Sequence, residues 1–503
     1  MKKVPPILGE VDVLRIALTL PGVQSVGEAA NGFHVRGGSA DQNLVLFYEA
    51  PVYNPTHFFG FFSSFNPDVI KSVDLYKGSI PAHYGGRISS VLDVQAKEGN
   101  NKKFSGSGGI SPVTARLTLE GPIIEDKASF ITGFRSTYSD WILKQLPNAN
   151  LKNSSASFYD LFGKVSFNLD ENNSLFAGGY FSKDGFSFNS DTIYGYTNAS
   201  ASLQWKHIYN NKIYSVFSGV YSGYSYSITN DKNEVNAFNL DYSLQNFIAK
   251  MDFSYFPTNR HKMDFGISSI FYGIQPGSLT PKGEQALITP EILEEEQGIE
   301  SAVYFGDIFD VTPNFSLYLG LRYSVYNSLG PKTVRIYSEN APLDDDNVVD
   351  INEYGDFENI QTYHGPEFRF SARYDLGSNS SIKLGFNRMR QYIHMLSNTT
   401  SISPTDIWIL SSKYIEPQIG DQISLGYFRN FNNNAIESSV EIYYKNIENL
   451  LDFKNGAVLL MNENIETEII KGKGKSYGAE FLVKKKTGKL NGWMSYTYSR
   501  ALI

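Results

Sequence analysis

Residues 161–181 read LFGKVSFNLDENNSLFAGGYF. The two ends of this stretch, 161–169 and 175–181, carry aromatic and β-branched residues at alternate positions, and the polar residues 170–173 separate them. A period of two predicts a strand with one apolar face, and a short polar interruption predicts a tight turn. The stretch therefore predicts two antiparallel strands joined by a hairpin turn.

The same unit recurs along most of the chain. Further strand cores are predicted at 115–119, 129–135 and 214–226, and further short connections at 125–127, 210–212, 257–260, 312–314, 377–380, 432–434 and 487–489. The connections between them include four that are too long for hairpin turns: 275–300, 330–363, 396–413 and 450–473. One tight rim and one elaborate rim are typical of a transmembrane β-barrel, with periplasmic turns and extracellular loops. Residues 101–503 are therefore predicted to form an antiparallel barrel sheet of about seventeen strands.

The composition agrees with a barrel in a membrane. Aromatic residues make up 14% of the chain, with 33 Tyr and 35 Phe, as expected where rings line both membrane interfaces. The mean hydropathy is -0.27, and no run of eighteen apolar residues predicts a transmembrane helix. The chain has no cysteine, so it has no disulfide or thiolate metal site, and its net charge of -8 argues against a nucleic-acid partner.

Residues 1–100 follow a different pattern. Val11, Leu14 and Leu18 share one face of a predicted helix that Pro21 and Gly22 stop, and short strands are predicted at 33–36, 44–48, 70–76 and 91–96. The pairs Gly37-Gly38 and Gly85-Gly86 permit positive φ angles and a close approach to a neighbouring wall. Because a barrel of about twenty strands is too wide for its own side chains to fill, this small α+β domain is predicted to plug the lumen.

Several sequence stretches resemble the TonB-dependent outer-membrane receptors, and specifically their Bacteroidetes type. In the plug they are LPGV (20–23), FHVRGG (33–38), PVYN (51–54) and residues 66–100; in the barrel they are EGP (120–122), 417–444 and 474–500, which includes GAE (478–480). One departure is Glu49-Ala50, where the family commonly has Asp-Gly, so the turn there is expected to differ in shape. The resemblance implies a plugged barrel of about 22 strands in a bacterial outer membrane.

The resemblance also implies which residues hold the plug. In the family, paired plug arginines meet barrel glutamates, and the matching positions here are Arg36, Arg87, Glu441 and Glu480. Each arginine lies beside one of the glycine pairs, and a guanidinium group can make two hydrogen bonds to a carboxylate. The alternative is that both arginines are ordinary solvated side chains.

The expected ligand site lies between the plug apex and the loops 275–300, 330–363 and 396–413. The apex candidates are Tyr53, Asn54, His57, Phe58 and Phe59, although the family resemblance favours packing against the barrel for the apolar run from 57 to 62. The acidic residues Asp344, Asp345, Asp346 and Asp350 lack the glycine-containing pattern of a calcium loop and predict a solvated loop instead. The seven histidines have no metal-ligand spacing, so no metal or cofactor is predicted.

The implied function is energy-coupled import of a scarce nutrient, such as a siderophore, vitamin, glycan or peptide. The implied partners are the TonB complex of the inner membrane, outer-membrane lipid and, left open, a surface lipoprotein. The alternatives are an ungated porin, which a folded N-terminal domain disfavours, and a barrel enzyme, for which no Ser, His and carboxylate set is placed.

The chain is also expected to be incomplete. The strand count falls about five short of the 22 in plugged transporters, and strand 490–498 is expected to run outward and leave Ile503 at the extracellular rim. No signal peptide is recognisable, because Pro5, Pro6 and Glu10 follow the basic start, and no coupling segment is recognisable before Val4.

Overall fold

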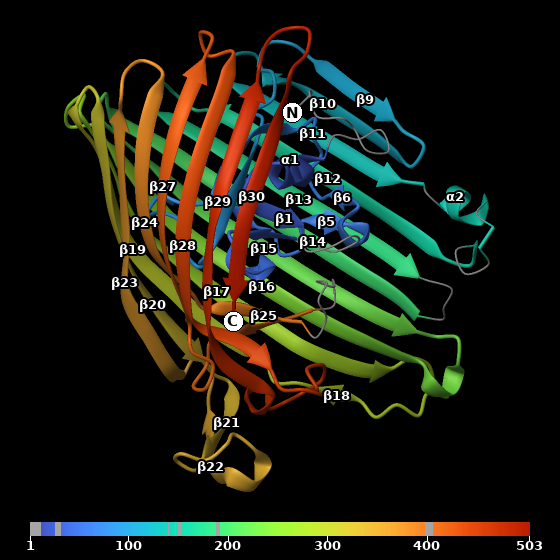
Figure 1. Ribbon diagram of the computed structural model, residues 1–503. Coiled ribbons are helices and arrows are strands. Elements are labelled where there is room, and N and C mark those ends of the chain that lie inside the picture. The colour runs from blue at the N-terminus through green and yellow to red at the C-terminus, as the bar shows by residue number, and fades with distance from the viewer. Residues whose placement is uncertain are drawn as a thin grey trace.

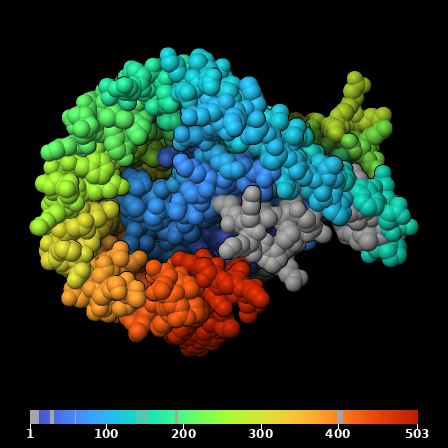
Figure 2. Space-filling view, turned by 90° about the horizontal axis from the view of Figure 1, so that it is seen from above, coloured from blue at the N-terminus to red at the C-terminus, as the bar shows by residue number. Residues whose placement is uncertain are grey.

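The computed structural model describes residues 12–25, 32–138, 140–145, 147–148, 152–187, 192–397 and 406–503. It consists of a large curved sheet around a small N-terminal domain (Figure 1). Seen from the rim of the short turns, the N-terminal domain lies inside the ring of strands (Figure 2). Neither of its two described α-helices is long and apolar enough to cross a membrane.

Within the described part of the chain, seventeen long strands form the barrel sheet, which confirms the expected count. They are β9 (Ser105–Ile110), β10 (Thr114–Ile124), β11 (Ala128–Thr137), β12 (Ser155–Asn168), β13 (Asn173–Ser187), β14 (Thr192–Asn210), β15 (Ile213–Asn230), β16 (Phe238–Tyr255), β17 (His261–Pro281), β19 (Glu296–Thr312), β20 (Phe315–Leu329), β23 (Asn359–Asp375), β24 (Ser380–Gln391), β27 (Gln418–Phe431), β28 (Ile436–Phe453), β29 (Ile469–Lys485) and β30 (Gly492–Leu502). The two-residue β18 (Glu291–Ile292) adds to β17.

Antiparallel registers join each neighbouring pair of long strands from β9–β10 to β29–β30. β9 and β30 are the two end strands of this series. Both of these strands are fully described, and no residue-by-residue register joins them. The described registers therefore form one continuous sheet from β9 to β30, which curves around the plug (Figure 2).

The short turns gather at one rim and the long connections at the other, as predicted (Figure 1). The long rim carries β21 (Lys332–Tyr337), β22 (Val348–Tyr354), β25 (Ile393–Leu396), β26 (Ile407–Leu410), η3 (Glu234–Asn236), η4 (Asp345–Asn347), η5 (Ile465–Thr467) and α2 (Asp140–Gln145). The loop predicted at 275–300 is shorter than expected, because β17 continues to Pro281 and β19 already begins at Glu296. β30 runs toward the rim of the long loops (Figure 1).

Alternation along the strands gives the sheet two different faces. On β19, Val303 is 56% exposed on the outside, whereas the next residue, Tyr304, is 5% exposed and faces inward. Outward Leu117, Leu203, Phe247, Leu319 and Ile442 repeat this exposure around the ring. An outward apolar band with polar and aromatic residues inside is the pattern of a barrel in lipid.

The plug contains a mixed four-stranded sheet with the order β4-β3-β8-β7, in which β3 and β8 are parallel. Its elements are α1 (Val13–Leu18), β1 (Val23–Ser25), β2 (Phe33–Val35), η1 (Ala40–Gln42), β3 (Asn43–Phe47), β4 (Ala50–Pro51), β5 (Thr56–His57), η2 (Phe58–Gly60), β6 (Phe62–Ser63), β7 (Ile70–Tyr76) and β8 (Ser90–Ala96). The side chain of Asp12 caps α1 by accepting a hydrogen bond from the Arg15 N–H. The predicted helix and all four predicted strands are present, although Val11 lies outside the described residues.

On the side of β11 to β13, the hydrophobic core of the plug extends into the barrel wall. Phe47 of the plug packs its ring 5.0 Å from Phe162 and 5.4 Å from Tyr180 of the barrel, measured between ring centroids. Leu14 and Val69 of the plug belong to the same buried cluster. Plug and wall therefore share one hydrophobic core here.

The turn at the departure from the family pattern has an unusual backbone. Tyr48 and Glu49 connect β3 to β4, and both have positive φ angles, 49° and 70°. A two-residue hairpin loop with two positive φ angles is favoured by the twist of the flanking strands, although such residues are normally Asn, Asp or Gly. The Glu49 carboxylate accepts a hydrogen bond of 2.8 Å from Lys250 Nζ on β16, so this turn is anchored to the barrel.

Candidate functional site

Arg36 follows β2 and reaches the barrel wall at β28 and β29. Its Nε and Nη2 donate to Glu480 at 2.8 and 3.1 Å, and Nη2 also donates to Glu441 at 3.1 Å. The arginine is 2% exposed and Glu480 is 1% exposed. The structure thus brings together three of the four residues expected at the plug–barrel contact.

Glu441 and Glu480 need positive charge from the plug. Glu441 and Glu480 are direct partners in the register of β28 and β29, and like charges in such cross-strand pairs repel. Besides Arg36, Lys77 of the plug donates from Nζ to Glu480 at 2.6 Å. Burial lowers the pKa of Lys77 and outweighs the opposing pull of the glutamate. The plug therefore supplies two cations to a barrel site that repels itself without them.

Glycine makes the approach possible. Gly22 has a φ angle of 79°, and a Cβ there would lie 1.9 Å from Glu480 Oε1. A Cβ at Gly37, with a φ of 71°, would lie 2.4 Å from Ser476 Oγ on β29. Of the predicted glycine turns, Gly85 faces Arg322 and Gly86 faces Glu300 on the barrel, whereas Gly38 faces Ser89 within the plug.

The expected pairing of Arg87 with Glu441 or Glu480 is wrong. Its guanidinium lies 5.3 Å from the ring centroid of Trp408 and 5.9 Å from that of Tyr53, and Nη1 donates to its neighbour's carbonyl at 2.7 Å. Gly85 and Gly86 place this segment beside β19 and β20, away from β28 and β29. Arg87 therefore faces an aromatic surface beneath the long loops instead of the two carboxylates.

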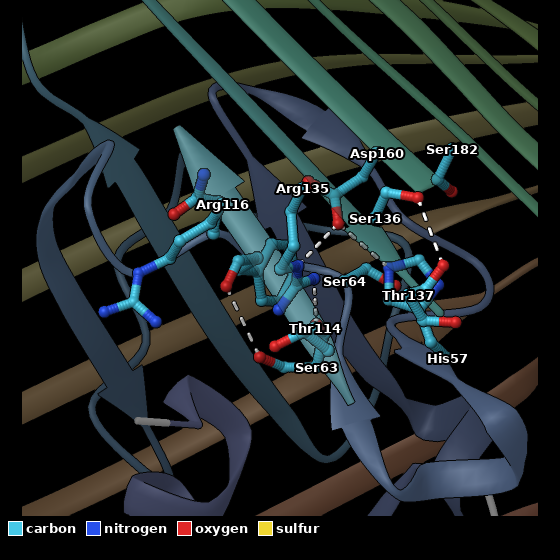
Figure 3. A network of polar contacts seen from close by, with 12 residues as sticks. His57, Ser63, Ser64, Thr114, Arg116, Arg135, Ser136, Thr137, Asp160 and Ser182 are labelled. Carbon is cyan, nitrogen blue, oxygen red and sulfur yellow. Dashed lines mark hydrogen bonds and ion pairs between the residues drawn. The ribbon is translucent and has the colours of Figure 1, made fainter. Parts of the chain in front are cut away.

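A second charged contact between plug and barrel involves His57. Its Nδ1 lies 2.8 Å from Asp184 Oδ2 on β13, and its Nε2 lies 3.4 Å from Asp160 Oδ2 on β12. Arg135 of β11 donates to Asp160 at 2.7 Å and to the Ser63 carbonyl of the plug at 2.7 Å (Figure 3). The imidazole is fully buried and stacks on Phe158 at 4.0 Å between ring centroids.

The surroundings favour the charged form of His57. Burial alone lowers the pKa of this imidazole, but the carboxylates of Asp184 and Asp160 outweigh burial and raise the pKa above its ordinary value. Protonated His57 and Arg135 then balance the two aspartates. This contact is missing from the expectations drawn from sequence.

The five apex candidates do not face an open lumen together. His57 and Asn54 are enclosed, and the Asn54 carbonyl accepts from Asn198 Nδ2 at 3.2 Å. Phe58 packs beside Phe158 at 5.1 Å, and Tyr53 lies 5.1 Å from Trp408 between ring centroids. The Phe59 side chain lies outside the described residues. For His57 and Asn54 the ligand-facing prediction is wrong, because the barrel wall already covers both side chains.

A cavity of about 320 Å³ lies among the long connections. Its lining includes Gln297 and Leu329 of the barrel strands, Arg335 of β21 and Ile409 of β26. Part of the predicted loop 396–413, residues 398–405, lies outside the described residues. In the acidic loop, Asp344 caps η4 and Asp345 pairs with Arg335. Among the described residues, no group of three or more His or acidic side chains is placed to hold a metal ion.

Comparison with protein families identifies the chain. The family described as TonB-dependent Receptor Plug Domain matches residues 9–91, and TonB dependent receptor-like, beta-barrel matches residues 136–502. The chain belongs to the TonB-dependent receptors. Membership places this TonB-dependent receptor in the bacterial outer membrane, in a family of ligand importers coupled to TonB. The Bacteroidetes type stays a prediction.

Solved structures share the fold of this TonB-dependent receptor. The siderophore receptor PirA from Pseudomonas aeruginosa is 15% identical over 99% of this chain and 83% of its own, with a TM-score of 0.66. The alcaligin receptor FauA from Bordetella pertussis is 14% identical over 98% and 77%, with a TM-score of 0.65. The FrpB iron transporter from Neisseria meningitidis is 11% identical over 99% and 79%, with a TM-score of 0.68. No curated protein matches the sequence.

Some functional residues of the receptor carry a usable sequence signal. Asp160 and Asp184 are charged residues inside strand-like segments, at positions that alternate with the outward Leu161 and Phe181. A charge at an inward position of a barrel strand marks a lumen site. The partner could not be found in this way, because the contact with His57 joins segments 127 residues apart.

Proposed function

We propose that this receptor captures a small nutrient at the cell surface and releases it to the periplasm when the energised TonB complex displaces the plug. In this proposal Arg36, Glu441, Glu480 and Lys77 form the latch that holds the plug at rest. The observation that carries the proposal is the cross-strand pair of glutamates, which two plug cations neutralise. Such a contact is strong while dry and weakens once water enters, so it suits a plug that must be held and then released.

The site of capture is proposed to lie between the plug apex and the long connections. Tyr53 reaches Trp408 there, and the cavity of about 320 Å³ opens among the same connections. We expect outer-membrane lipid to cover the outward apolar band, and a surface lipoprotein would have to bind at the rim of the long loops. We propose that this receptor catalyses no reaction, and a hydrolase screen of the purified protein would test this.

Ion conductance in planar lipid bilayers separates the plugged importer from an ungated porin. With the plug docked, we expect the wild-type chain to show conductance close to that of the empty bilayer. Loosening the latch with Arg36→Ala should increase the frequency of transient openings, whereas Asp68→Asn, which breaks a partly exposed plug–barrel pair, should not. Large steady conductance of the wild-type protein would contradict the proposal and favour the porin.

A further inference from the structure

The wall of the receptor holds a segment of its own chain in a manner suited to peptide recognition. β25 and β26 form a two-stranded hairpin inside the rim of the long connections, with Ile393 opposite Leu410 and Met395 opposite Trp408. One edge of β26 pairs with β25. Its other edge has no strand partner among the described residues and instead faces side chains of the barrel.

Those side chains make their hydrogen bonds with the main chain of the segment. The Tyr242 hydroxyl donates to the Trp408 carbonyl at 3.0 Å and lies 3.1 Å from the Trp408 N–H as its acceptor. Glu296 accepts from the Leu410 N–H at 2.9 Å. Residues 408 and 410 alternate, as they do on the free edge of any strand.

Just past the end of β26, the wall also binds two consecutive carbonyls of the chain. The Tyr326 hydroxyl donates to the Ser411 carbonyl at 2.9 Å, and the Tyr363 hydroxyl donates to the Ser412 carbonyl at 2.8 Å. The four wall residues come from β16, β19, β20 and β23, so the row crosses the barrel wall. Main-chain recognition of this kind fixes an extended peptide with little regard to its sequence.

The wall has capacity that the segment does not use. Gln297 Oε1 is buried without a hydrogen-bond partner among the described residues, and Gln297 lines the cavity of about 320 Å³ beside Ile407 and Ile409. The Tyr226 hydroxyl is also buried and has no hydrogen-bond partner there. A bound chain with larger or more polar side chains could therefore use groups that are idle in this structure.

We propose that Tyr242, Glu296, Tyr326 and Tyr363 form a binding site for an extended oligopeptide, which residues 407–412 occupy until a peptide ligand displaces them. The inference rests on the proposed import function and gives it a ligand class. Apolar side chains fit best, because the segment in the site carries Ile407, Trp408, Ile409 and Leu410. A glycan fits less well: sugars stack on open ring faces, whereas Tyr242 is stacked on Tyr226 and Tyr326 on Tyr392, each 4.9 Å apart.

The test uses the full chain in detergent and a blocked synthetic peptide with the sequence of residues 406–412, DIWILSS. Leu410→Pro removes the N–H that donates a hydrogen bond to Glu296 and keeps the edge of β26 that pairs with β25. It should therefore loosen residues 407–412 from the site and tighten binding of the added peptide by about tenfold. Trp408→Gly loosens the same segment and serves if the proline variant does not fold. Adding Tyr242→Phe and Tyr326→Phe should reverse the gain, whereas Tyr427→Phe on the outer face should not.

A second peptide, N-methylated at the tryptophan and leucine that correspond to 408 and 410, lacks the main-chain donors and should bind at least about tenfold more weakly. The proposal is overturned if neither loosened variant binds the peptide, if N-methylation has no effect, or if maltohexaose binds in its place. None of these measurements needs TonB. A negative binding result would therefore refute the peptide site without affecting the conductance test of the importer. A negative conductance result would likewise refute the plugged importer without affecting the peptide-binding measurement.

Discussion

Replacing Arg36 by alanine tests the latch directly. The substitution leaves Glu480, which is 1% exposed, opposite Glu441 with Lys77 as its remaining cation. Breaking a buried ion pair by removing one partner costs about 3–5 kcal/mol. Because Lys77 stays and the Glu441 side chain is 23% exposed to water, we expect the low end, about 3 kcal/mol of plug docking energy. This corresponds to a roughly 150-fold larger population of receptors with an open plug.

The absence of cysteine makes this population measurable. Ala17 is 3% exposed in the core shared by plug and barrel, so a reporter cysteine introduced there reacts with a maleimide only when the plug opens. The labelling rate then follows the open population. Arg36→Ala should accelerate labelling by roughly two orders of magnitude.

Two further variants make the result specific. Asp68→Asn removes the Arg116–Asp68 pair, whose side chains are 22% and 27% exposed, and should cost at most about 1 kcal/mol. Combining Arg36→Ala with Glu480→Gln removes the uncompensated buried charge and should restore most of the protection. Equal labelling rates for Arg36→Ala and Asp68→Asn would refute the reasoning, and a failed rescue would show that lost packing, not charge, is responsible.

Three other outcomes are expected. The pKa of His57 is raised in the docked state, so its contribution to docking is complete below the ordinary histidine pKa of about 6.5 and is lost as pH rises through the docked-state value. Reporter labelling should therefore accelerate with pH in the wild type and much less in His57→Gln. Parallel pH profiles of the two proteins would contradict this. Gly22→Ala should loosen the plug by about 2 kcal/mol in the same assay, because the added Cβ would overlap the Glu480 carboxylate. Gly163→Ala should not, because the space around that position is open. Indistinguishable labelling rates for the two variants would count against the close approach of Gly22 to Glu480. Val303→Arg on the lipid face should destabilise the barrel by about 2–4 kcal/mol in urea unfolding from liposomes, and an unchanged midpoint would argue that this face does not meet lipid.

The barrel was predictable because its signals are local. The eight short turns and the apolar alternation between them depend on neighbouring residues, and they yielded the strand count and the two unequal rims. Loop 275–300 was overestimated because a strand that leaves the membrane loses its apolar alternation without losing its hydrogen bonds. In the plug, the signals that predicted the helix and the four strands also depend only on neighbouring residues.

The plug–barrel contacts depended on information of another kind. The resemblance located Arg36 and both glutamates, but it also paired Arg87 with them, and the Gly85-Gly86 turn carries Arg87 to a different part of the wall. Which wall residue a plug residue meets depends on the rotation of the plug within the barrel. No periodicity in either segment encodes that rotation, and so the aspartates around His57 were also missed.

The core shared between plug and wall bears on how the receptor is pulled open. Phe47 and Leu14 are covered partly by Phe162, Tyr180 and Ile131 of the barrel, so a plug drawn out as a rigid body would expose apolar surface on both sides at once. Unravelling the plug from its N-terminal end instead exposes this surface in small steps. The barrel would then act as the template on which the plug refolds, so that each transport cycle includes a folding reaction on the inner surface of its own wall.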